Sequence, residues 1–322
     1  MKKRILLIFM VLFLLLPQAS AQDEVLEWVD FTLKYPALKA ALELDIASQG
    51  EEKAISWIDI LALASVRKGP SQVSAQAVRE AAAELKQDQS PQELLGKQYS
   101  YFAYYRRAYE AVLGGLVGNY AIKVRNPETG ETEWKATYGL KAFSPIAAGY
   151  GYSHYSDFGN KRSYGFARRH LGNDLMGALG TPIIAVESGT VEALGWNQYG
   201  GWRIGIRSDD KLRYYYYAHL RKDTPYVNGL SVGQHVTAGD VIGYMGRTGY
   251  STKENVNNIE TVHLHFGLQL VFDERQKECN SEIWVDVYDL VCLLDEHRSS
   301  VQYDAEHDEW VRIYPYRDLD KE

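Results

Sequence analysis

Cysteine is almost missing from this 322-residue chain, which contains only Cys279 and Cys292. Two cysteines are too few to form the framework of a disulfide-stabilised fold, so burial of apolar side chains must supply most of the stability. In an oxidising compartment the pair could close a small disulfide loop, although two buried free thiols fit the sequence nearly as well. About 300 residues are enough for two domains, each with its own hydrophobic core.

Apolar runs long enough to cross a membrane are also missing. The run from Ile5 to Leu16 covers twelve residues, whereas a membrane-spanning helix needs about 20. Basic residues at positions 2–4 precede this run, and small residues at positions 19–21 follow it. This layout is typical of a secretory signal peptide, residues 1–21, cleaved after Ala21. We therefore expect an exported protein, in the cell envelope or extracellular, without a stable membrane span after cleavage; an uncleaved anchor is the alternative.

Positive charge is scarce as well, because 35 lysines and arginines stand against 42 aspartates and glutamates, a formal net charge of −7. Loss of residues 1–21 would remove three basic residues and lower this charge to −10. An acidic protein of this kind is not expected to bind nucleic acid through a basic patch that follows the phosphates.

Histidine does not occur before His154, so the first part of the chain offers no candidate for histidine chemistry. Over residues 22–125, apolar residues recur every three or four positions, as they do in amphipathic helices. Pro36, Gly50, Gly69 and Ser90 divide this region into segments. We predict a helical N-terminal domain of four or five helices over residues 22–125.

The turn residues from Asn126 to Gly130 lie between two short strand-like runs and mark a change to a sequence rich in glycine and in β-branched or aromatic residues. We interpret residues 126–142 as a linker, residues 143–275 as a β domain, and residues 276–322 as a C-terminal extension packed on it. Within the extension, the spacing from Trp284 to Val291 predicts a short helix, followed by an extended end. Strands are expected at residues 182–196, 202–207, 212–220 and 232–245, with a hairpin turn at 208–210. The predicted fold class is multidomain α+β, its β part an antiparallel sandwich or open barrel.

The segment from Thr261 to Gly267 is predicted to be a strand with one polar face. Side chains alternate across a strand, so His263 and His265 point the same way while Leu264 and Phe266 point into an apolar interior. Two imidazoles about 7 Å apart along one strand could serve a single metal ion and its surroundings. Two exposed or hydrogen-bonded histidines without a metal are the alternative, so partners elsewhere in the chain must decide.

Suitable partners occur in the segment from His170 to Asp174. Gly172 lies between these two residues and argues against a helix, whereas a loop that runs into a strand can turn both side chains toward one point. Zinc binds nitrogen and oxygen ligands tetrahedrally, and a catalytic site keeps three protein ligands and one open position. His170, Asp174 and one histidine of the later pair would satisfy that description.

Taken together, these motifs resemble the M23 family of zinc metallopeptidases, the lysostaphin-like or LytM-type peptidoglycan endopeptidases. The family's first motif, His-x-Gly-x-Asp, is matched by residues 170–174, and its last, His-Leu-His-Phe, by residues 263–266. Between them lie Tyr-x-His-Leu, matched by residues 217–220, and a glycine-rich hairpin that begins at Val236. The four motifs occur in the family's order, so the resemblance implies a LytM-type peptidase domain.

Two departures from the family pattern concern the substrate cleft. The family usually reaches its histidine pair through a short Ser-Thr-Gly-Pro link, whereas here residues 253–262 follow Ser251 and Thr252. In addition, Gly267 stands where the family commonly has a glutamate. Neither departure removes a metal ligand, so both concern substrate specificity more than catalysis.

The resemblance implies that His170, Asp174 and His265 bind one Zn²⁺ ion, while His219 and His263 flank the attacking water. The chain has no His-Glu-x-x-His sequence and therefore no glutamate base of that kind. Proton transfer and oxyanion stabilisation fall to the two flanking histidines, and the sequence does not distinguish their roles. The remaining histidines are interpreted as structural or solvent-exposed: His154, His235, His297 and His307.

The predicted function is that of a secreted zinc metalloendopeptidase, a hydrolase that cleaves peptide bonds in cell-wall peptidoglycan. A catalytically inactive LytM-like binding, regulatory or scaffold protein is the alternative, and the complete set of five site residues favours the enzyme. The helical domain is expected to fold independently and to restrict access to the cleft or position the enzyme on its substrate. A fragment beginning near Phe143 would then be folded and active. Neither the bond that is cleaved nor any protein partner follows from the sequence.

Overall fold

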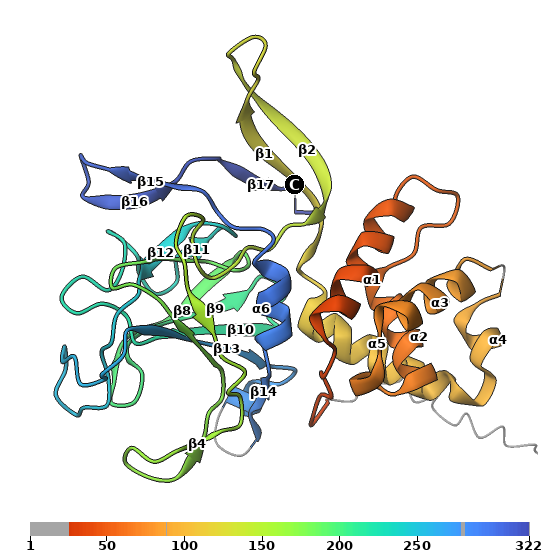
Figure 1. The fold of residues 1–322 in the computed structure, drawn as a ribbon, viewed down its shortest axis with the longest axis horizontal. Helices are drawn as coiled ribbons and strands as arrows, with labels where there is room; N and C mark the ends of the chain where they lie inside the picture. Colours follow the sequence, from red (N-terminus) through yellow and green to blue (C-terminus); the bar gives the residue numbers. More distant parts are fainter. Residues whose placement is uncertain (1–25, 88, 278–280, 322) are drawn as a thin grey trace, which may run out of the picture.

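The computed structural model describes residues 26–87, 89–277 and 281–321, arranged as a helical region beside a β region (Figure 1). The predicted signal peptide and its cleavage site lie outside the described residues. Within those residues, no helix is both long enough and apolar enough to cross a membrane. A mixed architecture of helices and an antiparallel sheet was predicted, and at this level it is confirmed.

Short helices with clear starting signals make up the N-terminal region. Its described residues form α1 (Tyr35–Ser48), α2 (Trp57–Lys68), α3 (Ala75–Leu85), α4 (Pro91–Leu95) and α5 (Tyr99–Leu113), with 3-10 turns η1 (Pro70–Gln72) and η2 (Gly96–Gln98). Ser56, Ser74 and Ser90 each accept a hydrogen bond from a backbone amide in the turn that follows, which is why α2, α3 and α4 begin where they do. Helix α2 packs against α1, α3 and α5, so the predicted array of helices is present.

The main β structure is one eight-stranded antiparallel sheet, with strand order β11-β8-β9-β10-β13-β6-β3 and with β14 also paired to β13. Its strands are β3 (Ser153–His154), β6 (Asn173–Met176), β8 (Gly189–Asn197), β9 (Gly201–Ser208), β10 (Arg213–Ala218), β11 (His235–Val236), β13 (His263–Leu270) and β14 (Ile283–Val285). Three two-stranded pairs accompany it: β4 (Lys161–Arg162) with β5 (Arg168–Arg169), β7 (Pro182–Ile184) with β12 (Val241–Tyr244), and β15 (Val301–Asp304) with β16 (Glu309–Arg312). The sandwich or barrel detail of the prediction is not confirmed.

Two of the four predicted strands are interrupted in the structure. The segment 182–196 divides into β7 and β8, and the segment 232–245 divides into β11 and β12. Strand β7 pairs with β12 and β8 pairs with β11, so residues 185–188 carry the chain from one sheet to another. The other two strands and the hairpin turn between them are confirmed as β9 and β10.

Residues 126–142, predicted to be a linker, instead belong to a β hairpin. Strands β1 (Val117–Arg125) and β2 (Thr132–Leu140) pair antiparallel along their whole lengths, and β17 (Tyr316–Asp318) adds to β1. The hairpin extends away from both regions in Figure 1. The turn residues were recognised correctly, but the partner strand β17 lies so far along the chain that no local pattern could indicate it. The helical region therefore ends at Leu113 and not at residue 125.

The C-terminal extension completes the main sheet before it forms a helix. Strand β6 pairs with β13 only from His263 to Phe266, so the later part of β13 has a free edge, which β14 fills from Leu268 to Leu270. Trp284, predicted to be helical, consequently lies in a strand. The predicted short helix follows as α6 (Tyr288–Leu294), which packs against α1.

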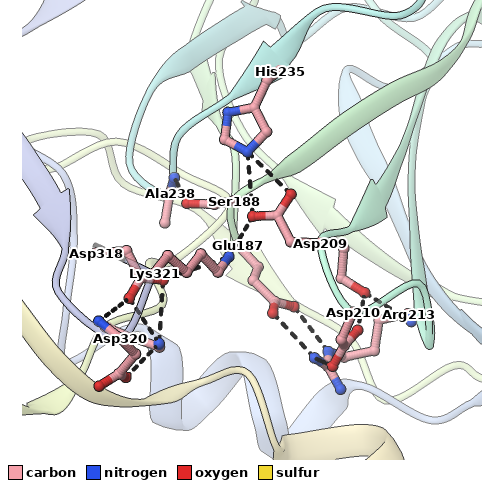
Figure 2. Close-up of polar contacts among 12 residues, drawn as sticks. Glu187, Ser188, Asp209, Asp210, Arg213, His235, Ala238, Asp318, Asp320 and Lys321 are labelled. Carbon is pink, nitrogen blue, oxygen red and sulfur yellow. Dashed lines mark hydrogen bonds and ion pairs between the residues drawn. The ribbon is translucent and has the colours of Figure 1, made fainter.

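The helical and β regions share buried contacts. Buried side chains of α1, α2 and α5 belong to the same apolar cluster as those of β10 and β13. Arg213 of β10 is fully buried, and its guanidinium donates to Glu187 at 2.8 Å (Figure 2). It also donates to the Ala111 carbonyl of α5 at 2.9 Å. These contacts argue against the predicted independent folding, because a fragment beginning near Phe143 would lack the groups that Arg213 contacts on α5.

Cys279 lies outside the described residues, so the Cys279–Cys292 disulfide stays a prediction. Cys292 of α6 is half-buried, and burial raises the pKa of its thiol, with Asp289 and Asp295 adding to the rise. If the bond forms, it closes a short loop and should contribute roughly 3 kcal/mol. The native protein is treated with a thiol-alkylating reagent without reductant, and its intact mass should then show no alkyl group added. Two added alkyl groups would contradict the prediction.

Candidate metal centre and its groove

Three predicted metal ligands come together where β13 runs antiparallel to β6. His265 on β13 lies directly opposite Asp174 on β6, and His170 lies just before β6. His170 and Asp174 are buried, and His265 is almost buried. The possible ligand atoms of the three residues all lie within 4.8 Å of one another.

Distances between the donor atoms suit a tetrahedral metal ion. The Nε2 atom of His170 lies 2.8 Å from Nδ1 of His265 and 3.1 Å from Oδ1 of Asp174, and the last two atoms are 3.3 Å apart. Ligands bound to zinc at about 2.0–2.1 Å are separated by roughly 3.3 Å. Two nitrogens and one oxygen therefore fit three corners of a zinc tetrahedron and leave the fourth corner open.

Electrostatics at this point favour a positive charge. Burial raises the pKa of Asp174, but hydrogen bonds from His170 and His265 outweigh that effect and hold the pKa far below its usual value. Burial lowers the pKa of His170, but hydrogen bonds to Asp157 and Asp174 outweigh it and raise the pKa to about 9. A bound metal ion would replace the proton that the carboxylates hold on His170.

Asp157 and Arg162 hold two of these ligands in place from outside the predicted motifs. A carboxylate oxygen of Asp157 lies 3.2 Å from Nδ1 of His170, which leaves Nε2 for the metal position. Arg162 donates to Asp157 at 2.7 Å and to Oδ2 of Asp174 at 3.0 Å. The other oxygen of Asp174, Oδ1, is the one that faces the metal position. Sequence reasoning missed both residues, because they lie in a loop and a two-residue strand without a periodic pattern.

His219 and His263 face the same centre with their rings 4.7 Å apart, and Nε2 of His263 lies 3.7 Å from Asp174. The Nδ1 atom of each ring lies 2.9 Å from a backbone carbonyl, that of Thr248 for His219 and that of Thr261 for His263. A carbonyl can only accept a hydrogen bond, so Nδ1 carries the hydrogen in both rings. In the neutral form of either ring, Nε2 is therefore the proton acceptor.

The backbone at His219 is itself unusual. It adopts a left-handed conformation, with φ of 63°, directly after β10, which costs a non-glycine residue roughly 1–2 kcal/mol. Its amide donates to the Gly200 carbonyl at 2.7 Å and so fixes this turn. Burial lowers the pKa of His219 well below its usual value, and the nearby His263 and His265 lower it further. The ring is therefore neutral at pH 7.

All five predicted site residues line one groove of about 860 Å³. Its walls come from β8, β10, β13, β14 and the segments around β5. Among the described residues, none before Arg162 lines the groove. In the part of the chain that the structure describes, the helical region therefore does not restrict access to the metal centre. The other role expected for it, positioning the enzyme on its substrate, stays a prediction.

Trp284 explains why position 267 has a glycine in place of the family's glutamate. A Cβ atom on Gly267 would lie 2.8 Å from the Trp284 ring and 2.9 Å from the Leu171 carbonyl. The Trp284 indole donates to Glu282 at 2.8 Å, and both side chains line the groove. The extension thus fills the space beside Gly267 with an aromatic ring and brings a carboxylate to the groove from the residue just before β14.

The four remaining histidines do not line the groove, as predicted. His235 and His307 are exposed and pair with Asp209 and Asp304. His297 is stacked on a neighbouring ring with centroids 4.1 Å apart and lies in hydrogen-bonding distance of a backbone carbonyl. His154 packs against Tyr288 of α6 with ring centroids 4.4 Å apart, so it does not reach the cleft.

His154 should make stability depend on pH. Both of its ring nitrogens are buried without a hydrogen-bond partner among the described residues, and burial lowers its pKa to about 4, despite three nearby carboxylates that raise it: Asp157, Asp289 and Asp295. A histidine in the unfolded chain has a pKa of about 6.5, so this contribution is complete above pH 6.5 and decreases as the pH falls toward 4. The loss should reach roughly 3 kcal/mol.

Urea unfolding of the metal-free wild type and of His154→Phe at pH 7 and pH 4.5 measures this effect without interference from metal release. The variant should lose much less stability between the two pH values than the wild type. Equal losses in the two proteins would contradict the prediction.

The part of the chain that holds this site is similar to proteins of one known family. Residues 168–279 match the profile of Peptidase family M23, and this stretch contains all five predicted site residues. The predicted resemblance to this family is therefore confirmed over residues 168–279. Asp157, Arg162, Glu282 and Trp284, which complete the site and its groove, lie outside the matched stretch.

Individual relatives are endopeptidases. The L-Ala--D-Glu endopeptidase of Bacillus subtilis (strain 168) is 40% identical over 117 residues, which make up 36% of this chain and 34% of that protein. The glycyl-glycine endopeptidase ALE-1 of Staphylococcus capitis is 36% identical over 115 residues, 33% of this chain and 28% of that protein. The matched stretch thus spans about a third or less of these relatives.

A solved structure extends the likeness in fold. It comes from Ruminococcus gnavus and belongs to a protein provisionally assigned as the glycyl-glycine endopeptidase lytM. It is 21% identical, with a TM-score of 0.52, and the alignment covers 85% of this chain and 93% of that chain. The likeness concerns the fold alone, but it reaches well beyond residues 168–279.

Proposed function

We propose that this chain is an exported zinc metalloendopeptidase that hydrolyses peptide bonds in cell-wall peptidoglycan. The observation that carries the proposal is the triangle of His170, Asp174 and His265 donors, faced by two further histidines with free Nε2 atoms. The match to Peptidase family M23 and the endopeptidase names of its relatives support the reaction class. Peptidoglycan as the substrate rests on the family resemblance.

His170 and His265 would hold the zinc ion through Nε2 and Nδ1, and Asp174 through Oδ1. The ion would supply a Lewis acid that polarises the peptide carbonyl and activates water. Asp157 would keep the proton of His170 on Nδ1, and Arg162 would hold the second oxygen of Asp174, so that neither ligand needs to reorient.

His219 and His263 would transfer protons on either side of the reacting peptide. His219 is neutral at pH 7 because burial lowers its pKa, so its Nε2 can accept a proton from the attacking water. His263 lies 4.7 Å away, ring centroid to ring centroid, and its Nε2 can donate to the oxyanion or to the leaving amine once it carries a proton. The roles can be exchanged between the two rings without changing this chemistry.

The groove would bind the peptide in an extended form. Tyr216 and Trp284 lie edge to face with centroids 6.2 Å apart, and Tyr216 lies edge to face with His265 at 5.8 Å. These rings form a wall that leads to the metal position and can pack against a peptide backbone or short side chains.

Digestion of purified sacculi tests the proposal directly. The zinc-loaded chain should release soluble muropeptides with new amino termini, identified by mass spectrometry, and a chelator should stop the release until zinc is added back. A protein that retains zinc at one ion per chain and releases nothing would instead support the inactive binding or scaffold function.

A further inference from the structure

One arginine of the groove is held in place without a carboxylate partner. The Arg168 guanidinium lies over the ring of Tyr199 at 4.7 Å and over the ring of Tyr250 at 5.6 Å, and it donates to the Tyr164 carbonyl at 2.6 Å. Tyr164 is itself stacked on Tyr250 with centroids 4.6 Å apart. Three tyrosines thus fix the position of a half-buried cation that lines the groove.

Arg168 differs from two other cations of the groove, which are paired with carboxylates, and from the exposed Arg169, whose position no aromatic ring fixes among the described residues. Arg162 is neutralised by Asp157 and Asp174, and Lys277, which also lines the groove, pairs with Glu192 at 2.9 Å. Within the described residues, the Tyr164 carbonyl is the only acceptor that Arg168 contacts, and no carboxylate pairs with it. In a protein with a net charge of −7, a fixed and unpaired guanidinium is an available anion site.

Arg168 is also close to the reacting groups. The Tyr250 ring that Arg168 covers lies edge to face with His219, with centroids 5.9 Å apart. A single aromatic ring therefore separates the Arg168 guanidinium from the His219 ring, which faces the metal position. An extended peptide covers the distance between these two groups in roughly three residues. An anion bound by Arg168 would belong to a residue near the scissile bond.

We propose that Arg168 recognises a free carboxylate on a substrate residue next to the scissile bond, so that a peptide with a glutamate there is preferred to one with glycine. The inference rests on the proposed peptidase function. A glutamate within a peptide uses one carboxyl group in the chain and leaves the other one free, whereas glycine offers none. A guanidinium binds such a carboxylate through charge-assisted hydrogen bonds, and Arg168 keeps donors available for it because only one contact to a carbonyl uses them.

Paired substrates test this recognition. The full-length zinc-loaded chain is assayed on L-Ala-γ-D-Glu-L-Lys, on the same peptide with the free carboxylate replaced by a carboxamide, and on pentaglycine. Wild type should cleave the acid peptide with a kcat/KM about 10- to 100-fold higher than the amide peptide, the usual worth of an ionic hydrogen bond. Arg168→Gln should remove that preference, and the matched variant Lys277→Gln should keep it.

Binding provides a second measurement that does not need turnover. Calorimetry with the metal-free chain should show tighter binding of the acid peptide than of the amide, and Arg168→Gln should abolish the difference. An Arg168→Gln variant that loses activity equally on both peptides would show that Arg168 only supports the tyrosines and would overturn the inference. Cleavage of pentaglycine alone would also overturn it while leaving the peptidase function intact. No cleavage of these peptides or of sacculi would defeat the proposed function itself.

Discussion

Replacement of His170, Asp174 or His265 by alanine should remove most of the bound zinc together with all peptidase activity. Each residue supplies one corner of a triangle with edges of 2.8, 3.1 and 3.3 Å, and loss of one of three ligands leaves an incomplete tetrahedral site. Zinc binding also stabilises the folded state, so these variants should melt like the chelated wild type. Elemental analysis beside muropeptide turnover measures both effects.

Replacement of His219 or His263 should give the opposite pattern. Neither residue belongs to the ligand triangle, so the zinc content should stay near one ion per chain while the rate falls by about 10²- to 10⁴-fold, the usual contribution of one positioned acid-base group. His235→Ala is the matched control, because His235 is exposed and pairs with Asp209 outside the groove. Loss of zinc in the His219 variant, or full activity without His263, would require a different assignment of roles.

The largest effect on stability should come from Arg213→Met. Arg213 is fully buried, pairs with Glu187 (Figure 2) and donates to the carbonyl end of α5, so its removal leaves the Glu187 carboxylate buried without its ionic partner. Breaking such a buried pair costs about 3–5 kcal/mol. Urea unfolding measures the loss. The double variant with Glu187→Met should recover much of it, because the buried carboxylate is then removed and Asp210, the other carboxylate that pairs with Arg213, is partly exposed.

Arg275→Met provides the control for that experiment. Arg275 forms an ion pair with Asp273 at 2.7 Å, but its side chain is 85% exposed. Exposed pairs of this kind contribute little to stability, because water screens their charges. If the two arginine variants were equally stable, the buried contact to α5 would not join the helical and β regions as described.

The polar face of β13 was predictable because side-chain alternation in a strand is a local property. His263 and His265 indeed lie on the side of the metal centre, while Leu264 and Phe266 are fully buried on the other side. The same logic failed for Trp284, whose spacing suited a helix. Its conformation is set by the free edge of β13, which belongs to another part of the chain.

The residues around the ligands were harder to predict than the ligands themselves. Asp157 and Arg162 reach His170 and Asp174 only because a loop and a short hairpin fold over them. A carboxylate and a guanidinium in such segments look like ordinary surface residues in the sequence. Their function depends on distances in space that neither periodicity nor a motif encodes.

Pairing of β17 with β1 determines the order in which this chain can fold. The β1–β2 hairpin needs only its own turn and can form early, because its partners are close in sequence. The β1–β17 contact and the hydrogen bond between Asn119 and Asp320, 201 positions apart, require the ends of a very long loop to meet. Contacts between residues so far apart in sequence form slowly. The edge of β1 that pairs with β17 should therefore stay unpaired until the rest of the β region has folded.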